Sequence, residues 1–278
     1  MTRLLFSTGS LYPIDTAYCF ELAHDAGFAG IEVMCDARWS TRDPHYLKRL
    51  SERHNLPVKV LHTPFSASLT GWDDANYDEV ARVRCTVQLA ESLSAEAVVL
   101  HLPRAFSWAS LNMRGRQVRF PWLDRTRRLK SWFAHGLADL QGETRVKIAV
   151  ENMPLWDMWG RKVNYSYWNS VEAWSGVHDW LTLDTTHWAT HGIDPLAAYD
   201  AARERVCHIH LSNYDGREHR LPHQGAVRLD KFLQGLAEDD FSGTISLEVH
   251  PDALEFSDDA RVRQNLRESV EFCRMHLA

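Results

Sequence analysis

The sequence predicts an α/β fold, a single (β/α)₈ TIM barrel that occupies residues 1–278 as one domain. Three observations lead to this prediction. Short apolar runs alternate with longer segments of helical periodicity along the whole chain, which implies parallel strands joined by helical crossovers. Eight such runs are present, the number that closes a barrel in a chain of this length. The competing fold is a doubly wound open sheet. No GxGxxG motif follows the first run, which excludes the commonest nucleotide-binding form of that fold.

The expected elements follow from these patterns. The predicted strands are Leu4–Ser7, Gly30–Met34, Val58–His62, Ala97–His101, Lys147–Asn152, Trp180–Asp184, Val206–Ser212 and Thr244–Val249. The predicted helices are Thr16–Ala26, Pro44–His54, Tyr77–Leu93, Leu123–Leu140, Pro195–Arg203, Leu229–Glu238 and Asp259–His276. Asp15 or Thr16 is a suitable N-cap and Gly27 a suitable C′ residue for the first helix. The longest loops, Pro103–Pro121, Met153–Asn169 and Asn213–Val227, all follow strands, and in a barrel such loops build the active face.

The composition excludes several classes of protein. With 45% apolar and 24% charged residues, the chain is neither disordered nor collagenous nor a small disulfide scaffold. Its 31 basic and 37 acidic residues give a net charge of −6, which argues against a strong electrostatic grip on nucleic acid. Five scattered cysteines without a CxxC pair suit reduced thiols, and no run approaches the roughly 20 apolar residues of a membrane span. We therefore expect a cytoplasmic protein with no membrane partner.

Polar residues end six consecutive predicted strands, where a parallel strand covered on both faces should stay apolar. These residues are His62, His101, Glu151, Asp184, His210 and Glu248. Because side chains at i and i+2 share a face, the polar residues point the same way as the residues two positions before them: Val60 with His62, Val99 with His101, Ala149 with Glu151, and Thr182 with Asp184. If that side is the interior, all six meet at the mouth of the barrel. A mixed set of imidazoles and carboxylates without cysteine suits a divalent ion such as Mn²⁺, Zn²⁺, Co²⁺ or Mg²⁺.

Two further interior positions have open interpretations. Glu32 shares its direction with Gly30 and Met34, and either orients a metal ligand or pairs with a neighbouring base. His208 points inward one layer below His210, and we expect a core histidine that donates to a backbone carbonyl.

Tryptophan is abundant in the segments that follow strands, where flat rings can pack on the C–H face of a sugar or stack on bases. These residues are Trp39, Trp72, Trp108, Trp156, Trp159, Trp168 and Trp188. We select Trp108 and Trp188 as candidate substrate contacts, although part of the set can equally cap the barrel.

The motifs Glu151-Asn152, Asp184-Thr-Thr-His187, His210-Leu-Ser-Asn213 and Leu247-Glu248, with the opening Gly27-Phe28-Ala29-Gly30-Ile31-Glu32-Val33, resemble the xylose isomerase-like TIM-barrel superfamily. The resemblance covers essentially the whole chain. This superfamily contains sugar isomerases, ketose 3-epimerases, inosose-processing enzymes and endonuclease IV.

The resemblance to the sugar-epimerase branch implies one divalent ion on Glu151, Asp184, His210 and Glu248. It also implies that Glu151 and Glu248 act as the acid/base pair on opposite faces of the substrate. His187 and Arg217 match positions that hold substrate oxygens in that branch.

The endonuclease IV branch binds three zinc ions, and His62, His101, His187 and His219 match its additional histidines. This chain has Arg217 where that branch has an aspartate ligand, and a guanidinium cannot ligate a metal. We therefore favour sugar chemistry, assign His62, His101 and His219 to substrate contacts, and leave a further ion through His187 and His219 open.

The sequence thus predicts a metal-dependent isomerase or epimerase of a sugar, keto-sugar or inosose that works by enediolate proton transfer. The alternatives are a dehydratase or lyase with the same enediolate step, and an endonuclease IV-like zinc phosphodiesterase. The expected partner is a small polyhydroxylated molecule rather than nucleic acid, and the sequence leaves a homo-oligomer open.

Overall fold

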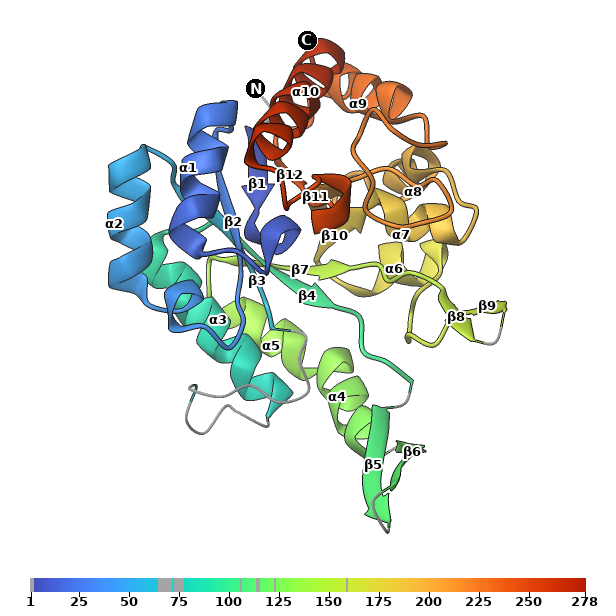
Figure 1. Ribbon diagram of the computed structural model, residues 1–278. Coiled ribbons are helices and arrows are strands. Elements are labelled where there is room, and N and C mark those ends of the chain that lie inside the picture. The colour runs from blue at the N-terminus through green and yellow to red at the C-terminus, as the bar shows by residue number, and fades with distance from the viewer. Residues whose placement is uncertain are drawn as a thin grey trace.

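The computed structural model describes residues 3–64, 72, 78–105, 107–113, 116–122, 124–158 and 160–278, and within 106–126 it describes the backbone of these ranges but no side chains. Eight parallel strands close into a barrel in the order β1-β12-β11-β10-β7-β4-β3-β2, with helices around it (Figure 1). They are β1 (Arg3–Ser7), β2 (Gly30–Met34), β3 (Val58–His62), β4 (Ala97–His101), β7 (Lys147–Glu151), β10 (Trp180–Asp184), β11 (Val206–Leu211) and β12 (Thr244–Leu247). The predicted (β/α)₈ barrel is confirmed, and each predicted strand ends within two residues of an observed one.

Each barrel strand is buried on both faces, which explains the apolar runs in the sequence. In β11 every residue is buried: Ile209 and Leu211 belong to the main core under the helices, and His208 and His210 alternate with them. Inside the barrel, Leu5, Val60, Ala97 and Val99 form a second, small apolar cluster. The interior is therefore apolar on the side of β1, β3 and β4 and polar on the side of β11.

The strand register aligns the polar strand ends. His101 of β4 lies opposite Glu151 of β7, and Asp184 of β10 lies opposite His210 of β11. Neighbouring polar residues therefore lie at one level, at the carboxyl end of the barrel.

The outer layer consists of helices that connect the strands. They are α1 (Thr16–Ala26), α2 (Pro44–His54), α3 (Glu79–Leu93), α4 (Asp124–Ala134), α5 (Gly136–Glu143), α6 (Val171–Val177), α7 (Thr185–Thr190), α8 (Pro195–Ala202), α9 (Leu229–Glu238) and α10 (Asp259–His276), with the 3₁₀ turns η1 (Thr8–Leu11), η2 (Trp39–Thr41) and η4 (Pro251–Ala253). The predicted caps of α1 are present: the Asp15 carboxylate accepts from the Ala17 N–H, and Gly27 is left-handed at φ 86°.

The single helix predicted over Leu123–Leu140 is wrong, because the chain breaks into α4 and α5 at His135. His135 leaves the helical region at φ −135°, and Gly136 lies so close to the Trp132 ring that an added Cβ would come within 2.4 Å of Trp132 Cδ1. The short helices α6 and α7 were not predicted. α6 follows the long loop Met153–Asn169, and α7 directly follows β10. Each helix has too few residues to show a clear helical periodicity.

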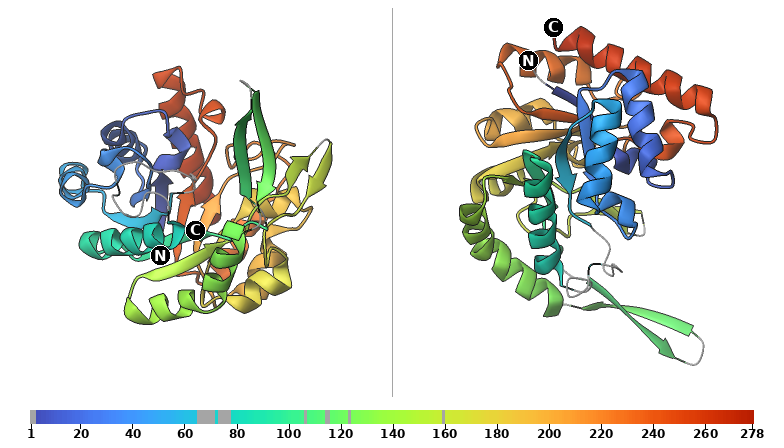
Figure 2. Two further views of the ribbon diagram at one scale, coloured as in Figure 1. Left: turned by 90° about the horizontal axis from the view of Figure 1, so that it is seen from below. Right: turned by 90° about the vertical axis from the view of Figure 1, so that its left-hand side faces the viewer.

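Two of the three long post-strand loops carry β-hairpins. β5 (Ser107–Met113) pairs with β6 (Arg116–Trp122), and β8 (Trp156–Met158) pairs with β9 (Arg161–Val163). Both hairpins project from the barrel (Figure 2). The sequence had indicated only loops there.

The five cysteines are unpaired, in accordance with the prediction of free thiols. Within the described part of the chain, no helix combines the length and the apolar character that crossing a bilayer would require.

Candidate metal centre and active site

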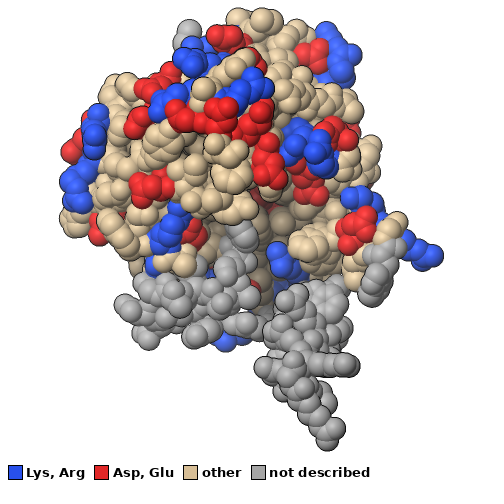
Figure 3. All heavy atoms as spheres, in the orientation of Figure 1, with Lys and Arg blue, Asp and Glu red and all other residues tan. Residues whose placement is uncertain are grey.

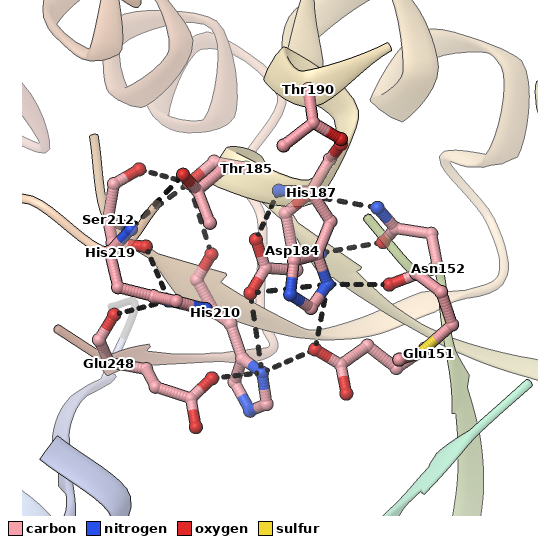
Figure 4. A network of polar contacts seen from close by, with 12 residues as sticks. Glu151, Asn152, Asp184, Thr185, His187, Thr190, His210, Ser212, His219 and Glu248 are labelled. Atoms are coloured by element: carbon pink, nitrogen blue, oxygen red, sulfur yellow. Dashed lines mark hydrogen bonds and ion pairs between the residues drawn. The ribbon is translucent and has the colours of Figure 1, made fainter. Parts of the chain in front are cut away.

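Four predicted ligands lie together at the carboxyl end of the barrel. Glu151, Asp184 and His210 belong to β7, β10 and β11, and Glu248 directly follows β12. Each residue offers one oxygen or nitrogen atom, and these four atoms lie within 4.8 Å of one another (Figure 4). Divalent ions bind oxygen and nitrogen at about 2.0–2.6 Å, so one ion can reach all four atoms.

The position of Asp184 is determined by its backbone. Asn152 holds that backbone on both sides, since its Oδ1 accepts from the Asp184 N–H at 2.8 Å and its amide donates to the Asp184 carbonyl at 3.1 Å. Asp184 also caps α7, with Oδ1 accepting from the His187 N–H at 2.8 Å. The other oxygen, Oδ2, is buried with no hydrogen-bond partner in the described structure, although it lies 3.6 Å from His187 Nδ1 and 3.9 Å from His210 Nδ1. A buried carboxylate oxygen in this state fits a cation ligand.

The charges of this cluster are unbalanced. Burial, together with the charges of Glu151 and Glu248, raises the pKa of Asp184 to about 8. Burial alone would lower the pKa of His210, but the surrounding carboxylates, with Glu248 first among them, raise it well above its ordinary value. Burial alone would raise the pKa of Glu151, but His210 and His101 hold it well below its ordinary value. Among these four residues, three buried carboxylates meet one imidazole, and a bound dication would remove the mutual repulsion of the carboxylates.

His62 and His101 lie on one side of Glu151. The Nε2 atoms of His101 and His62 are 3.1 Å and 3.4 Å from Glu151 Oε2. The His62 ring also stacks on His210 at a centroid distance of 5.7 Å, and its Nδ1 lies 2.8 Å from the Thr63 carbonyl. His62, His101 and Glu151 form a second group of potential ligands.

His187 and His219 lie on the other side, beside Asp184. His187 Nδ1 donates to the Asn152 carbonyl at 2.7 Å, and none of the hydrogen bonds or ion pairs among the described residues involves Nε2. His219, in the left-handed region at φ 57°, places Nδ1 3.2 Å from both Ser212 Oγ and the Glu248 carbonyl. Asp184, His187 and His219 form a third group of potential ligands.

Comparison with known proteins confirms the family. The model of the family described as xylose isomerase-like TIM barrel matches residues 20–275. The chain belongs to this family.

This xylose isomerase-like barrel also has relatives of similar length. An uncharacterized protein of Mycobacterium leprae is 28% identical, with 98% of this chain and 96% of the relative covered, and one of Mycobacterium tuberculosis matches equally well. Solved structures share the fold. The D-psicose 3-epimerase from Clostridium cellulolyticum H10, in a structure with D-tagatose, has a TM-score of 0.69 at 13% identity and covers 99% of each chain. A D-tagatose 3-epimerase-like protein has 0.67 at 19% over both whole chains, and an AP endonuclease of family 2 from Brucella melitensis has 0.64 at 16% over 90% of this chain and 94% of its own.

The xylose isomerase-like barrel does not bring every predicted site residue to the cluster. The Arg217 side chain is 71% exposed and pairs with Asp215. The Asp215 carboxylate accepts from the Arg217 backbone N–H and from its guanidinium, with Nη2 2.7 Å from Oδ2. Trp188 is fully buried in the core, edge-on to Trp174 at 5.5 Å. Neither side chain lies at the four-residue cluster in this structure, so their roles as substrate contacts stay predictions. Trp108 lies in β5, and its side chain falls outside the described residues, as does Trp159.

The sequence prediction missed Gly9, which follows β1. A Cβ at this position would lie 3.2 Å from Glu248 Oε1 and 2.5 Å from Met34 Cε. The missing side chain therefore leaves room for the Glu248 carboxylate beside Met34. A glycine two residues after the end of a predicted barrel strand is the signal that could have identified it.

Proposed function

We propose that this protein is a divalent-metal-dependent isomerase or epimerase of a polyhydroxylated carbonyl compound: a sugar, keto-sugar or inosose. The arrangement of two glutamates supports this most directly. His210 Nδ1 lies 2.9 Å from Glu151 Oε1 and 2.8 Å from Glu248 Oε2, and Figure 4 shows the two carboxylates on either side of the His210 ring. Proton transfer that changes a configuration needs a base and an acid on two sides of one carbon.

Glu151, Asp184, His210 and Glu248 would hold the ion in this proposal, and their three carboxylates and one imidazole suit Mn²⁺, Zn²⁺, Co²⁺ or Mg²⁺. When bound, such an ion supplies Lewis-acid polarisation of a carbonyl oxygen and a neighbouring hydroxyl. The buried, unpartnered Asp184 Oδ2 supports this ligand set.

The two glutamates would move the proton. One takes it from the carbon that bears the hydroxyl, and the C–H electron pair becomes the C=C bond of an enediolate. The other glutamate gives a proton to the opposite face of that carbon in an epimerase, or to the neighbouring carbon in an isomerase, and the carbonyl re-forms. Although burial opposes it, the pKa of Glu248, like that of Glu151, is lowered by His210, so either group can act as the carboxylate base. The other glutamate must enter the step protonated, since it gives the second proton.

The histidines around the pair would bind and orient the substrate. His187 is held through Nδ1 by the Asn152 carbonyl, so its Nε2 can donate to or accept from a substrate oxygen. His101 and His62 contact Glu151 Oε2 and would fix the direction of that carboxylate.

Uptake of deuterium from solvent tests the proposal. Purified protein is incubated in D₂O with ketoses and inososes and with each of the four ions, and label at carbon is followed by NMR. We expect exchange by the wild type and a loss of at least about 100-fold in Glu151→Gln and in Glu248→Gln, since a positioned acid or base contributes this much.

Glu96→Gln is the matched control, because it makes the same chemical change in a half-exposed carboxylate at the opposite end of the barrel. It should exchange as the wild type does. Full turnover in both Glu151→Gln and Glu248→Gln would refute the proton-transfer mechanism.

A second candidate function is a zinc phosphodiesterase that resembles endonuclease IV. The two extra ligand groups, one with His62 and His101 and one with His187 and His219, support it, because they adjoin the first group on both sides. The surface gives it less support: on the face in Figure 3, basic and acidic side chains are interspersed, and the described residues form no continuous basic band there. About three zinc ions per purified chain would favour the phosphodiesterase, whereas one exchangeable ion would favour sugar chemistry.

A further inference from the structure

Glu32, in β2, is a fully buried carboxylate that lies between two imidazole rings below the mouth of the barrel. Its Oε1 is 3.0 Å from His210 Nε2, and its Oε2 is 3.0 Å from His208 Nε2. All three side chains are fully buried. Each oxygen of Glu32 thus serves a different ring, and one of these rings belongs to the four-residue cluster.

The chemistry of the carboxylate determines where the protons lie. An ionised carboxylate only accepts hydrogen bonds, so both Nε2 atoms must carry hydrogen. Both contacts have the same length, 3.0 Å, as expected for a carboxylate that accepts from the two rings alike. With its proton on Nε2, His210 can present the lone pair of Nδ1 to a cation between Glu151 and Glu248.

The second ring extends this arrangement to β12. His208 Nδ1 lies 2.7 Å from Thr244 Oγ1, and because Nε2 of a neutral His208 carries the proton, Nδ1 accepts from the threonine hydroxyl. The partners of His208 are thus two side chains, which corrects the expectation of a backbone carbonyl. The His208 ring stands edge-on to His210, with centroids 5.0 Å apart and planes at 89°. Thr244, His208 and Glu32 form a continuous hydrogen-bonded chain that ends on His210.

We propose that Glu32 is the positioning residue of the metal centre: it holds the proton of His210 on Nε2 and fixes the ring so that Nδ1 faces the ion, while His208 and Thr244 hold Glu32 in place. The proposal rests on the proposed function, since it assigns His210 as a ligand. It also explains why three polar residues, Glu32, His208 and Thr244, lie in the interior of the barrel below the site.

Zinc affinity tests this role in the full-length protein. Zn²⁺ alone is titrated against a chromophoric chelator for the wild type, Glu32→Gln, Glu32→Asp and Thr182→Val. A glutamine has one acceptor and one donor, so it can accept from only one of the two rings and no longer fixes both protons. We expect Glu32→Gln to weaken Zn²⁺ binding at least about tenfold, as loss of an outer partner of a ligating histidine does, and Glu32→Asp to recover part of that loss.

Thr182→Val is the matched control. Thr182 faces the same interior and pairs in register with His208, but its buried hydroxyl has no hydrogen-bond partner in the described structure. It should bind Zn²⁺ as the wild type does. Equal Zn²⁺ affinity in Glu32→Gln and Thr182→Val would overturn the proposal.

A second measurement uses only the wild type and so does not depend on whether a variant folds. The ¹⁵N spectrum of the labelled imidazoles should show hydrogen on Nε2 of both His208 and His210, and a bare Nε2 on either ring would overturn the proposal. If the wild type binds no Zn²⁺, Mn²⁺, Co²⁺ or Mg²⁺, the proposed function fails, whereas this spectrum still decides the orientation that Glu32 imposes.

Discussion

Acidic side chains have different partners at the two ends of the barrel. At the amino end, Glu96 accepts from both Arg3 and Lys59, and Arg203 pairs with Asp239. Both of these acids, Glu96 and Asp239, lie against a base. At the carboxyl end, Glu151, Asp184 and Glu248 meet with histidines as their basic partners in the described contacts.

Burial differs as much as pairing does. Glu96 is 37% exposed, and the hydrogen bond from Arg3 lowers its pKa. Asp184 is fully buried, and its pKa rises to about 8. Half-exposed pairs of opposite charge are worth little and cost little, whereas buried like charges are expensive unless something compensates them. At the amino end these charges are therefore paired, whereas the carboxyl end gathers buried acidic groups that a bound cation would compensate.

The largest expected effect comes from Asp184→Asn, which keeps the shape and the helix cap but removes one charge. Loss of a ligand should weaken Zn²⁺ binding by more than the roughly 10–100-fold typical of outer partners. In chelator at pH 8 the same variant should unfold at a higher temperature than the wild type, because it removes the cost of burying this charge and its repulsion with Glu151 and Glu248. Calorimetry and thermal unfolding measure the two effects, and a variant that is less stable and binds Zn²⁺ normally would contradict the comparison.

A second effect concerns pH. The folded pKa of Asp184, about 8, lies above the ordinary 3.8, so the folded state holds this proton more tightly than the unfolded state. The stability that this proton contributes is complete below about pH 3.8 and is lost as the pH rises through about 8. In chelator, the stability advantage of Asp184→Asn over the wild type should therefore grow between pH 4 and pH 8. An advantage that stays constant over this range would show that Asp184 does not titrate there.

The smallest effect is expected at the amino end. Glu96→Gln should lower the free energy of unfolding by only about 0.2–1 kcal/mol, since it breaks half-exposed pairs with Arg3 and Lys59. Zn²⁺ affinity should not change. Denaturant titration and the chelator assay check both values, and a loss of several-fold in Zn²⁺ affinity would mean that the two ends are coupled.

Most of the barrel could be predicted because strand and helix periodicity are local. The helices at Thr16–Ala26, Pro44–His54, Leu229–Glu238 and Asp259–His276 have the predicted bounds. The break at His135 was not predicted, and in the structure the Trp132 ring lies against Gly136, directly after the break.

The candidate site divides in the same way. His187 and Trp188 are neighbours in the sequence and were both assigned to the substrate. Successive helical residues point about 100° apart, so in α7 His187 faces the cluster and Trp188 faces Trp174. Without knowledge of where α7 begins, the sequence cannot separate the two.

The sequence by itself determined the eight-stranded barrel and the identity of Glu151, Asp184, His210 and Glu248 as strand-end residues, because two-residue alternation and strand direction are written in the local pattern. Only the tertiary structure determined which of these side chains contact one another. In it, Glu32 contacts His208 and His210, and Asp184 Oδ2 has no hydrogen-bond partner among the described residues. Arg217 is exposed and pairs with Asp215. Such contacts depend on register, helix start and loop conformation, which are settled only when distant segments pack together.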